Sequence, residues 1–191
     1  EQRQAYERLK LTAIMVMKDE EVSYNNKLTE LLKLQQVANG FIKTNEGSIV
    51  DFKTNAKLKE LMSIIEETQD KCIIWANYVH NIEDIKKKLA ETYGVDSVVS
   101  IYGKDSVDAR NQAVEKFQNN EECRFLVGNP TVGGYGLTLT AAKYVIYYSN
   151  SYNLEVRQQS EDRAHRIGQK SQVTYIDIIC RDTIDQMVLH N

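Results

Sequence analysis

Cys72-Ile-Ile-Trp-Ala76 is a short, uninterrupted apolar stretch that decides the fold class of this chain. Such a run is typical of a β-strand covered on both faces, because it has no alternating polar positions. Similar runs recur later, and segments with helical spacing separate them. This alternation predicts an α/β fold with a parallel sheet and crossover helices. The further strand candidates are residues 98–102, 124–128, 144–148 and 173–180.

Apolar residues at a 3.6-residue spacing predict helices on both sides of the first strand and another after residue 105. Asp105 and Ser106 are both able to cap this last helix. Trp75 lies inside a strand, so we interpret it as a core residue. The helix markers are Leu58, Leu61, Met62, Ile65, Ile82, Ile85, Leu89, Ala113, Val114 and Phe117.

Residues 1–52 have a different pattern from the rest of the chain. Tyr6, Leu9 and Ala13 form one helical stripe, and leucines continue the helical pattern after a polar break. A turn at residues 44–48 allows the apolar residues on both sides of it to pair as a short hairpin. We therefore expect a helical segment over 1–52 and a main α/β domain over 53–191.

Composition narrows the function classes. With 191 residues, 42% hydrophobic content and a net charge of −3, the chain suits one sizeable domain with an appendage and is not a strongly basic nucleic-acid binder. Cys72, Cys123 and Cys180 occur singly, which predicts reduced thiols in a cytoplasmic protein and no metal site. No apolar run reaches the ~18 residues of a membrane span. Because the chain starts with Glu1 rather than Met, we expect it to be part of a longer polypeptide.

Polar residues follow the predicted strands, at the edge where α/β proteins place their chemistry. One such segment, residues 128–139, is rich in glycine, which favours either phosphate contact by backbone amides or simply a tight turn. It is neither a Walker A loop nor a dinucleotide fingerprint. Without a phosphate-binding loop of its own, the chain is not expected to hydrolyse ATP alone.

The stretch Arg157-Gln-Gln-Ser-Glu-Asp-Arg-Ala-His-Arg-Ile-Gly-Gln169 carries the clearest polar pattern. A helix ending near Gly168 would place Gln159, Asp162, Arg163 and Arg166 on one face. Such a face is either solvated, with internal ion pairs, or it presents arginine fingers to a transferring phosphoryl group. The planar guanidinium of arginine suits phosphate.

Residues 159–169 resemble motif VI of the Swi/Snf-type DNA-dependent ATPases, within the superfamily two helicases. Residues 72–78 and 128–139 are similar to motifs IV and V, in the same order, and the similarity covers nearly the whole chain. The resemblance implies the C-terminal RecA-like lobe, a three-layer parallel sheet with flanking helices. It also implies that the N-terminal helical segment arrives from a first lobe that is absent here.

The resemblance also implies roles for individual residues. Arg163 and Arg166 would be the catalytic arginine fingers, reaching ATP and Mg²⁺ that the first lobe mainly holds. This chain alone is expected to bind no cofactor and no metal. The expected nucleotide-binding residues are Gln159, Asp162, Gly134 and Gly136. The expected DNA-binding residues are chosen by position: Asn77 and Lys104 follow predicted strands, and Thr131 has a hydroxyl near the glycine-rich turn.

The chain departs from the family pattern at two places. In motif V, Asn129, Pro130 and Thr138 replace the usual Ser-Thr and Asn. Before motif VI, Ser151-Tyr-Asn-Leu154 replaces the usual Trp-Asn-Pro run. These differences indicate a divergent branch, bacterial or phage-encoded, with a cytoplasmic location (nuclear if eukaryotic).

The sequence therefore predicts the C-terminal lobe of an ATP-dependent double-stranded DNA translocase or remodeller. Its expected partners are the first RecA-like lobe of the same polypeptide and double-stranded DNA, with no membrane. The alternative is a noncatalytic nucleic-acid- or protein-binding domain of the same fold. A dinucleotide-binding enzyme domain is disfavoured by the missing fingerprint.

Overall fold

A computed structural model describes residues 1–18, 23–135, 137–166 and 172–189. The chain divides into two compact units, one of residues 1–62 with the segment from Ile179 onward, the other Ser63–Ile178. Within the described ranges, no helix is both long and apolar enough to cross a bilayer. The boundary between residues 52 and 53 stays a prediction for the complete protein.

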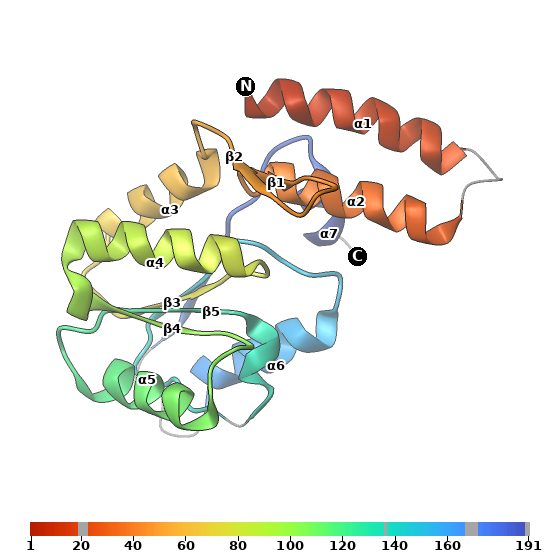
Figure 1. Ribbon diagram of the computed structural model, residues 1–191. Helices are drawn as coiled ribbons and strands as arrows, with labels where there is room; N and C mark the ends of the chain where they lie inside the picture. Colours follow the sequence, from red (N-terminus) through yellow and green to blue (C-terminus); the bar gives the residue numbers. More distant parts are fainter. Residues whose placement is uncertain (19–22, 136, 167–171, 190–191) are drawn as a thin grey trace. The chain divides into compact units, whose positions relative to one another are not determined.

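The second unit contains a five-stranded sheet in the order β4-β5-β3-β6-β7 (Figure 1). Every neighbouring pair of strands is parallel, which requires a crossover connection between them. The five strands predicted from apolar runs are confirmed, although the last is shorter than its run. The strands are β3 (Cys72–Trp75), β4 (Val98–Ile101), β5 (Phe125–Gly128), β6 (Tyr144–Tyr147) and β7 (Thr174–Asp177).

Helices cover both faces of this sheet and give it three layers. Figure 1 shows α4 (Val79–Tyr93) on one side of the strands and α5 (Val107–Asn119) with α6 (Leu154–Ala164) on the other. Trp75 is fully buried in the core cluster that includes residues of α5 and α6, so its assignment to the core is confirmed. Short 3₁₀ helices are η1 (Val95–Ser97) and η2 (Pro130–Tyr135).

The start of α5 agrees with one of the two predicted caps. The Ser106 hydroxyl accepts a hydrogen bond from the Ala109 amide at 3.2 Å, satisfying a donor that the first turn leaves free. The Asp105 carboxylate instead accepts from the Tyr102 amide at 2.7 Å and closes the preceding turn. Ser106 is therefore the cap.

The end of α6 differs from the sequence prediction. The helix ends at Ala164, and His165 has φ −96° and ψ 78°, outside the helical region. The predicted end at Gly168 is wrong, and Gly168 itself lies outside the described residues. Arg166 consequently follows the helix, and only Gln159, Asp162 and Arg163 share its last turns.

The first unit is helical with a small hairpin, as predicted for its N-terminal part. Strands β1 (Phe41–Lys43) and β2 (Ile49–Asp51) pair antiparallel across the predicted turn. The Ile184 amide, at the start of α7, donates to the Tyr6 hydroxyl of α1 at 2.7 Å. The helices are α1 (Gln2–Lys18), α2 (Tyr24–Ala38), α7 (Ile184–Leu189) and α3 (Ala56–Glu66), which continues into the second unit.

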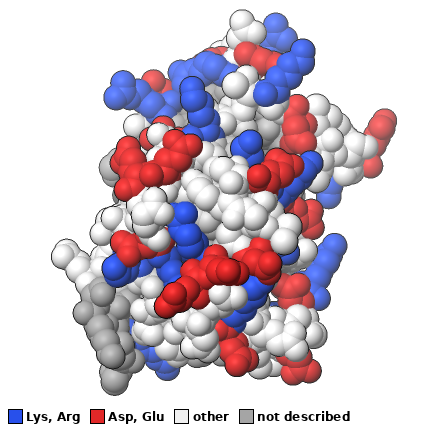
Figure 2. Space-filling model, turned by 90° about the vertical axis from the view of Figure 1, so that its left-hand side faces the viewer, with Lys and Arg blue, Asp and Glu red and all other residues white. Residues whose placement is uncertain are grey.

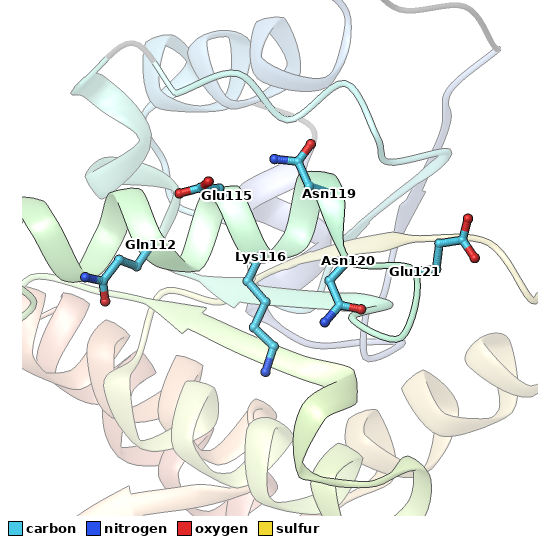
Figure 3. A pocket seen from close by; sticks show the side chains of 6 residues that line it. All are labelled: Gln112, Glu115, Lys116, Asn119, Asn120 and Glu121. Carbon is cyan, nitrogen blue, oxygen red and sulfur yellow. The ribbon is translucent and has the colours of Figure 1, made fainter.

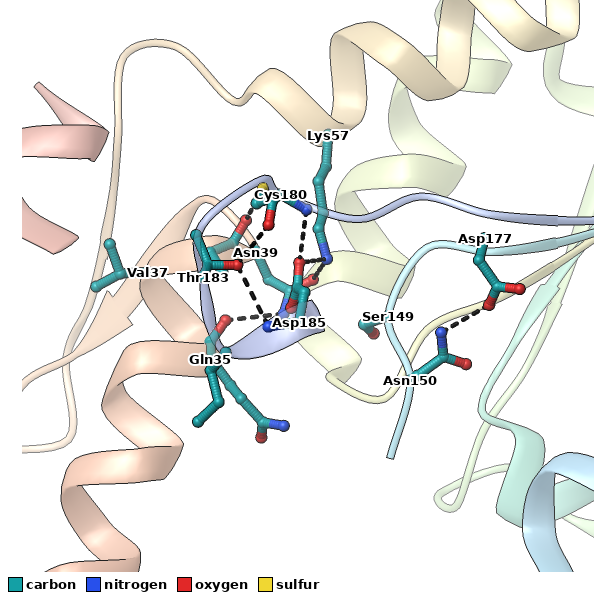
Figure 4. Close-up of polar contacts among 12 residues, drawn as sticks. Gln35, Val37, Asn39, Lys57, Ser149, Asn150, Asp177, Cys180, Thr183 and Asp185 are labelled. Atoms are coloured by element: carbon teal, nitrogen blue, oxygen red, sulfur yellow. Dashed lines mark hydrogen bonds and ion pairs between the residues drawn. The ribbon is translucent and has the colours of Figure 1, made fainter. Parts of the chain in front are cut away.

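A buried ion pair joins α3 to α7 within the first unit (Figure 4). Lys57, 2% exposed, lies with its Nζ 2.6 Å from the Asp185 carboxylate and also donates to Asn39 Oδ1 at 3.2 Å. Asn39 in turn donates to the Gln35 carbonyl, and the Cys180 amide donates to Asp185. A buried charge requires such partners, so the segment after Ile179 completes the first unit.

Gly128 ends β5 at a point of close approach between three strands. A Cβ atom there would lie 2.6 Å from Ile101 Cγ1, 2.7 Å from the Ile101 carbonyl oxygen and 3.2 Å from the Trp75 ring. Backbone atoms and a buried ring are unable to move away without a cost in free energy. Packing within the sheet therefore requires the glycine that opens the glycine-rich segment.

Gly128→Ala is expected to lower the free energy of unfolding by about 1–3 kcal/mol, the usual range for overpacking a core. Urea unfolding monitored by circular dichroism measures this change. Gly103→Ala is the matched control, because nothing lies within 4 Å of its added Cβ. Equal stability of the two variants would contradict the packing explanation.

Candidate functional site

Helix α6 is held on the sheet by contacts along its buried side. Ser160 and Ala164 are fully buried, and the hydroxyls of Ser160 and Tyr147 are hydrogen-bonded at 2.6 Å. The Tyr175 hydroxyl donates to the Glu161 carbonyl at 3.3 Å. The Leu139 amide donates to the Arg163 carbonyl at 3.0 Å, fixing the last turn. Side chains on the opposite side of α6 are thus presented from a fixed backbone.

The end of α6 forms a pocket of about 420 Å³ that brings the predicted motif residues together. Although Arg166 lies beyond the helix, it still lines this pocket, and its Nη1 donates to Thr138 Oγ1 at 3.3 Å. Gln159 is exposed and donates to Glu155 at 3.0 Å. The lining residues are Gln159, Asp162, Arg163, His165 and Arg166.

Arg163 is the least satisfied group of this pocket. Its Nε is buried and has no hydrogen-bond partner among the described residues. Burial lowers the pKa of Arg163, the neighbouring charge of Arg166 lowers it further, and Asp162 partly offsets these effects. The guanidinium remains charged at neutral pH, because an arginine pKa starts far above it. An anion bound in this pocket would add negative charge beside the two guanidinium groups, beyond that of Asp162.

The glycine-rich segment lies next to this helix. Residues 130–135 form η2, which packs against α6 and contains Gly134. Gly136, the second predicted nucleotide-binding glycine, lies outside the described residues. Parts of the segment on both sides of Gly136 thus lie beside α6, since η2 packs against the helix and the Leu139 amide bonds its last turn.

Two predicted DNA-binding residues are linked at the carboxyl edge of the sheet. The Asn77 amide donates to Ser149 Oγ at 2.9 Å, and the Asn77 carbonyl accepts from Asn129 Nδ2 at 2.9 Å. Asn129 Oδ1 accepts from the Thr131 amide at 2.9 Å. This chain of hydrogen bonds crosses the ends of β5, β3 and β6. Asn129, noted in the sequence only as a departure from motif V, is its central member.

Lys104 is not part of that chain of hydrogen bonds. It is exposed in the turn after β4, the outer neighbour of β5. Arg110 Nη2 donates to the Gly103 carbonyl at 3.4 Å and supports the same turn. Basic and acidic side chains are interspersed on the face shown in Figure 2, in keeping with the slightly negative net charge.

Arg157 is a residue whose role sequence reasoning missed. Although it opens the stretch 157–169, it does not line the α6 pocket. It pairs instead with Asp177 at the end of β7 and with Glu161 on α6. Asn150 donates to Asp177 at 2.7 Å, a contact drawn in Figure 4. The available signal was the position of Asn150 shortly after β6 and of Asp177 at the end of the neighbouring strand β7.

A second polar pocket, of about 560 Å³, lies along the last turns of α5 (Figure 3). It contains none of the predicted site residues. Lys116, which lines it, pairs with Asp96 at 2.7 Å. The lining residues are Gln112, Glu115, Lys116, Asn119, Asn120 and Glu121.

Comparisons with known sequences agree with the motif interpretation. Residues 55–168 match the family described as helicase conserved C-terminal domain. An uncharacterized ATP-dependent helicase of Mycoplasma genitalium is 30% identical over 192 residues, 98% of this chain and 18% of the relative. The putative ATP-dependent helicase/translocase YwqA of Bacillus subtilis is 37% identical over 132 residues, 69% of this chain and 14% of that protein. The chain thus spans less than a fifth of these relatives.

A solved structure gives the same answer for the fold. The Sulfolobus solfataricus SWI2/SNF2 ATPase core in complex with dsDNA has a TM-score of 0.79 and 25% identity, over 99% of this chain and 40% of that chain. The RecA-like parallel sheet and the helical N-terminal segment predicted from the sequence are both confirmed. The chain belongs to the helicase conserved C-terminal domain family, as a RecA-like C-terminal lobe of the Swi/Snf type.

Proposed function

We propose that this chain is the C-terminal lobe of an ATP-dependent double-stranded DNA translocase or remodeller, with Arg163 and Arg166 as its arginine fingers. The observation that carries the proposal is the pocket at the end of α6, which Arg163 and Arg166 line together with Gln159. Family membership and the ATP-dependent helicases among the relatives support the same activity. ATP would supply the phosphoryl group whose charge the arginines stabilise.

The side chains of the α6 pocket fit a phosphate group. Arg163 and Arg166 offer planar arrays of N–H donors, and Gln159 adds an amide. The partial burial of Arg163 reduces screening by water and strengthens its attraction to developing negative charge. ATP and Mg²⁺ would be held mainly by the first lobe, because this chain has no Walker A sequence.

The carboxyl edge of the sheet is the proposed DNA-binding surface. Asn77 and Thr131 are held in position through Asn129, and Lys104 offers an exposed ammonium after the neighbouring strand. Hydroxyl, amide and ammonium groups contact backbone phosphates without reading sequence. The solved SWI2/SNF2 core in complex with dsDNA supports DNA as the partner. A noncatalytic binding domain would need this edge but not the pair of arginines in the α6 pocket.

Arg163→Ala and Arg166→Ala are each expected to lower kcat for DNA-stimulated ATP hydrolysis by the full-length protein. An arginine finger contributes on the order of 10³- to 10⁵-fold in rate, about 4–7 kcal/mol. Steady-state ATPase assays with duplex DNA give kcat and KM. The KM for ATP is expected to change little, because the interaction strengthens in the transition state.

Arg8→Ala is the matched control, an exposed helical arginine of the first unit. Unchanged kcat in folded Arg163→Ala and Arg166→Ala would contradict the finger role. Absence of ATP turnover in the wild-type protein would favour the noncatalytic binding domain.

The isolated chain, residues 1–191, is expected to show no ATP turnover with or without duplex DNA. It contains the arginines but no phosphate-binding loop. A phosphate-release assay tests this, with the full-length protein as positive control. Sustained turnover by the purified chain that is abolished by Arg163→Ala would contradict the division of the site between two lobes.

Lys104→Ala is expected to weaken duplex DNA binding by the full-length protein several-fold, since it removes one phosphate contact. The slope of log Kd against log salt concentration should fall by about 1. Fluorescence anisotropy over a range of salt concentrations measures both changes. Lys116→Ala, a lysine on α5 paired with Asp96, is the control, and an equal effect of the two variants would argue against this edge.

A further inference from the structure

Two arginines of α6 have opposite surroundings. Arg163 has a buried Nε without a partner among the described residues, and its pKa is lowered by burial and by Arg166. Arg157, about one and two-thirds turns earlier, is surrounded by acceptors. Burial opposes its charge, but hydrogen bonds to Asp177 and Glu161 outweigh this effect and raise the pKa of Arg157. The same residue type therefore serves two purposes on one helix.

The donors of Arg157 are already used within the second unit. Nη1 and Nη2 together hold the two oxygens of Asp177, with the Nη2 contact at 3.1 Å. Nη1 also donates to Asn150 Oδ1 at 2.9 Å, and Nε donates to Glu161. Four hydrogen bonds to three partners leave little capacity for phosphate. Arg157 is therefore not a third finger.

The partners of Arg157 come from different elements of the unit. Asp177 ends β7, Asn150 follows β6, and Glu161 lies one turn further along α6. The guanidinium also lies 3.4 Å from the centroid of the Tyr147 ring in β6. Tyr147 contacts α6 again through Ser160, and burial raises the pKa of Tyr147, so it remains a neutral hydrogen-bonding group.

These contacts fix the start of α6 on the carboxyl ends of β6 and β7. A bidentate arginine–carboxylate pair constrains direction as well as distance, which a point charge does not. Arg163 lies six residues later, ~9 Å along the helix axis. A change in the orientation of α6 at Arg157 therefore also shifts the Arg163 guanidinium.

We propose that Arg157 is a positioning residue, which through Asp177 sets the orientation of α6 and thereby the place of the Arg163 guanidinium. This inference rests on the proposed finger role of Arg163. It makes the Arg157–Asp177 pair part of the preorganisation that a finger requires.

The test is a double-mutant cycle on ATP hydrolysis by the full-length protein with duplex DNA. Arg157→Lys keeps the charge but loses the bidentate pairing, and should lower kcat on the order of 10- to 100-fold. KM for ATP and the affinity for DNA should change by less than about 2-fold, because Arg157 contacts neither ligand in this proposal. In the Arg163→Ala background, Arg157→Lys should cause no further loss, since its effect passes through Arg163.

Further variants keep the outcomes distinct. Asp177→Asn preserves side-chain size and should reproduce the effect of Arg157→Lys, which covers the case in which one variant folds poorly. Asp96→Asn breaks the Lys116 ion pair elsewhere in the same unit and should leave kcat unchanged. Losses that multiply in the double mutant, or a kcat unchanged by both Arg157→Lys and Asp177→Asn, would overturn the positioning role alone. An Arg163→Ala variant with normal kcat would overturn the finger role and this inference together.

Discussion

A parallel sheet covered by helices on both faces confines polar chemistry to the ends of its strands. In the second unit, β3 and β5 are completely buried, so Asn77 and Asn129 are placed just after them. The same constraint puts Asn150 after β6 and Asp177 at the end of β7. Because all strands point in one direction, these side chains share one edge, and α6 is the helix anchored to it. The proposed DNA-binding residues and the residues that anchor α6 therefore lie at one edge of the sheet for the same reason.

The contrast between Arg157 and Arg163 along α6 is consistent with the proposed arginine-finger role of Arg163. A buried, unpaired N–H group costs free energy, and Arg163 carries this cost in the described part of the chain. Its backbone is nevertheless fixed by Leu139, and the start of the helix is fixed by Asp177. The contacts of Asp177 and Leu139 thus hold the helix, while the Arg163 guanidinium lines the pocket where a phosphate group would bind. An isolated solvated helix would have no reason to combine these features.

The strands of the sheet could be predicted from the sequence because a strand buried on both faces is a run of consecutive apolar residues. Cys72–Ala76 and Tyr144–Tyr148 are of this kind, and motif VI supplied the site residues that share the α6 pocket. Sequence reasoning failed where geometry depends on one backbone position or on distant partners. Helix propensity gave no sign that His165 leaves the helical region. Likewise, the pairing of Arg157 with Asp177 and of Lys57 with Asp185 joins residues 20 and more positions apart, which no local pattern encodes.

The buried Lys57–Asp185 pair has a consequence for the order in which the chain is assembled. During synthesis from the N-terminus, Lys57 is present well before Asp185 emerges from the ribosome. The first unit therefore lacks its internal counter-charge throughout the translation of the second, whose residues 63–178 are contiguous. Domains that are contiguous in sequence are able to fold as they are made. In this chain the unit that begins first is completed last.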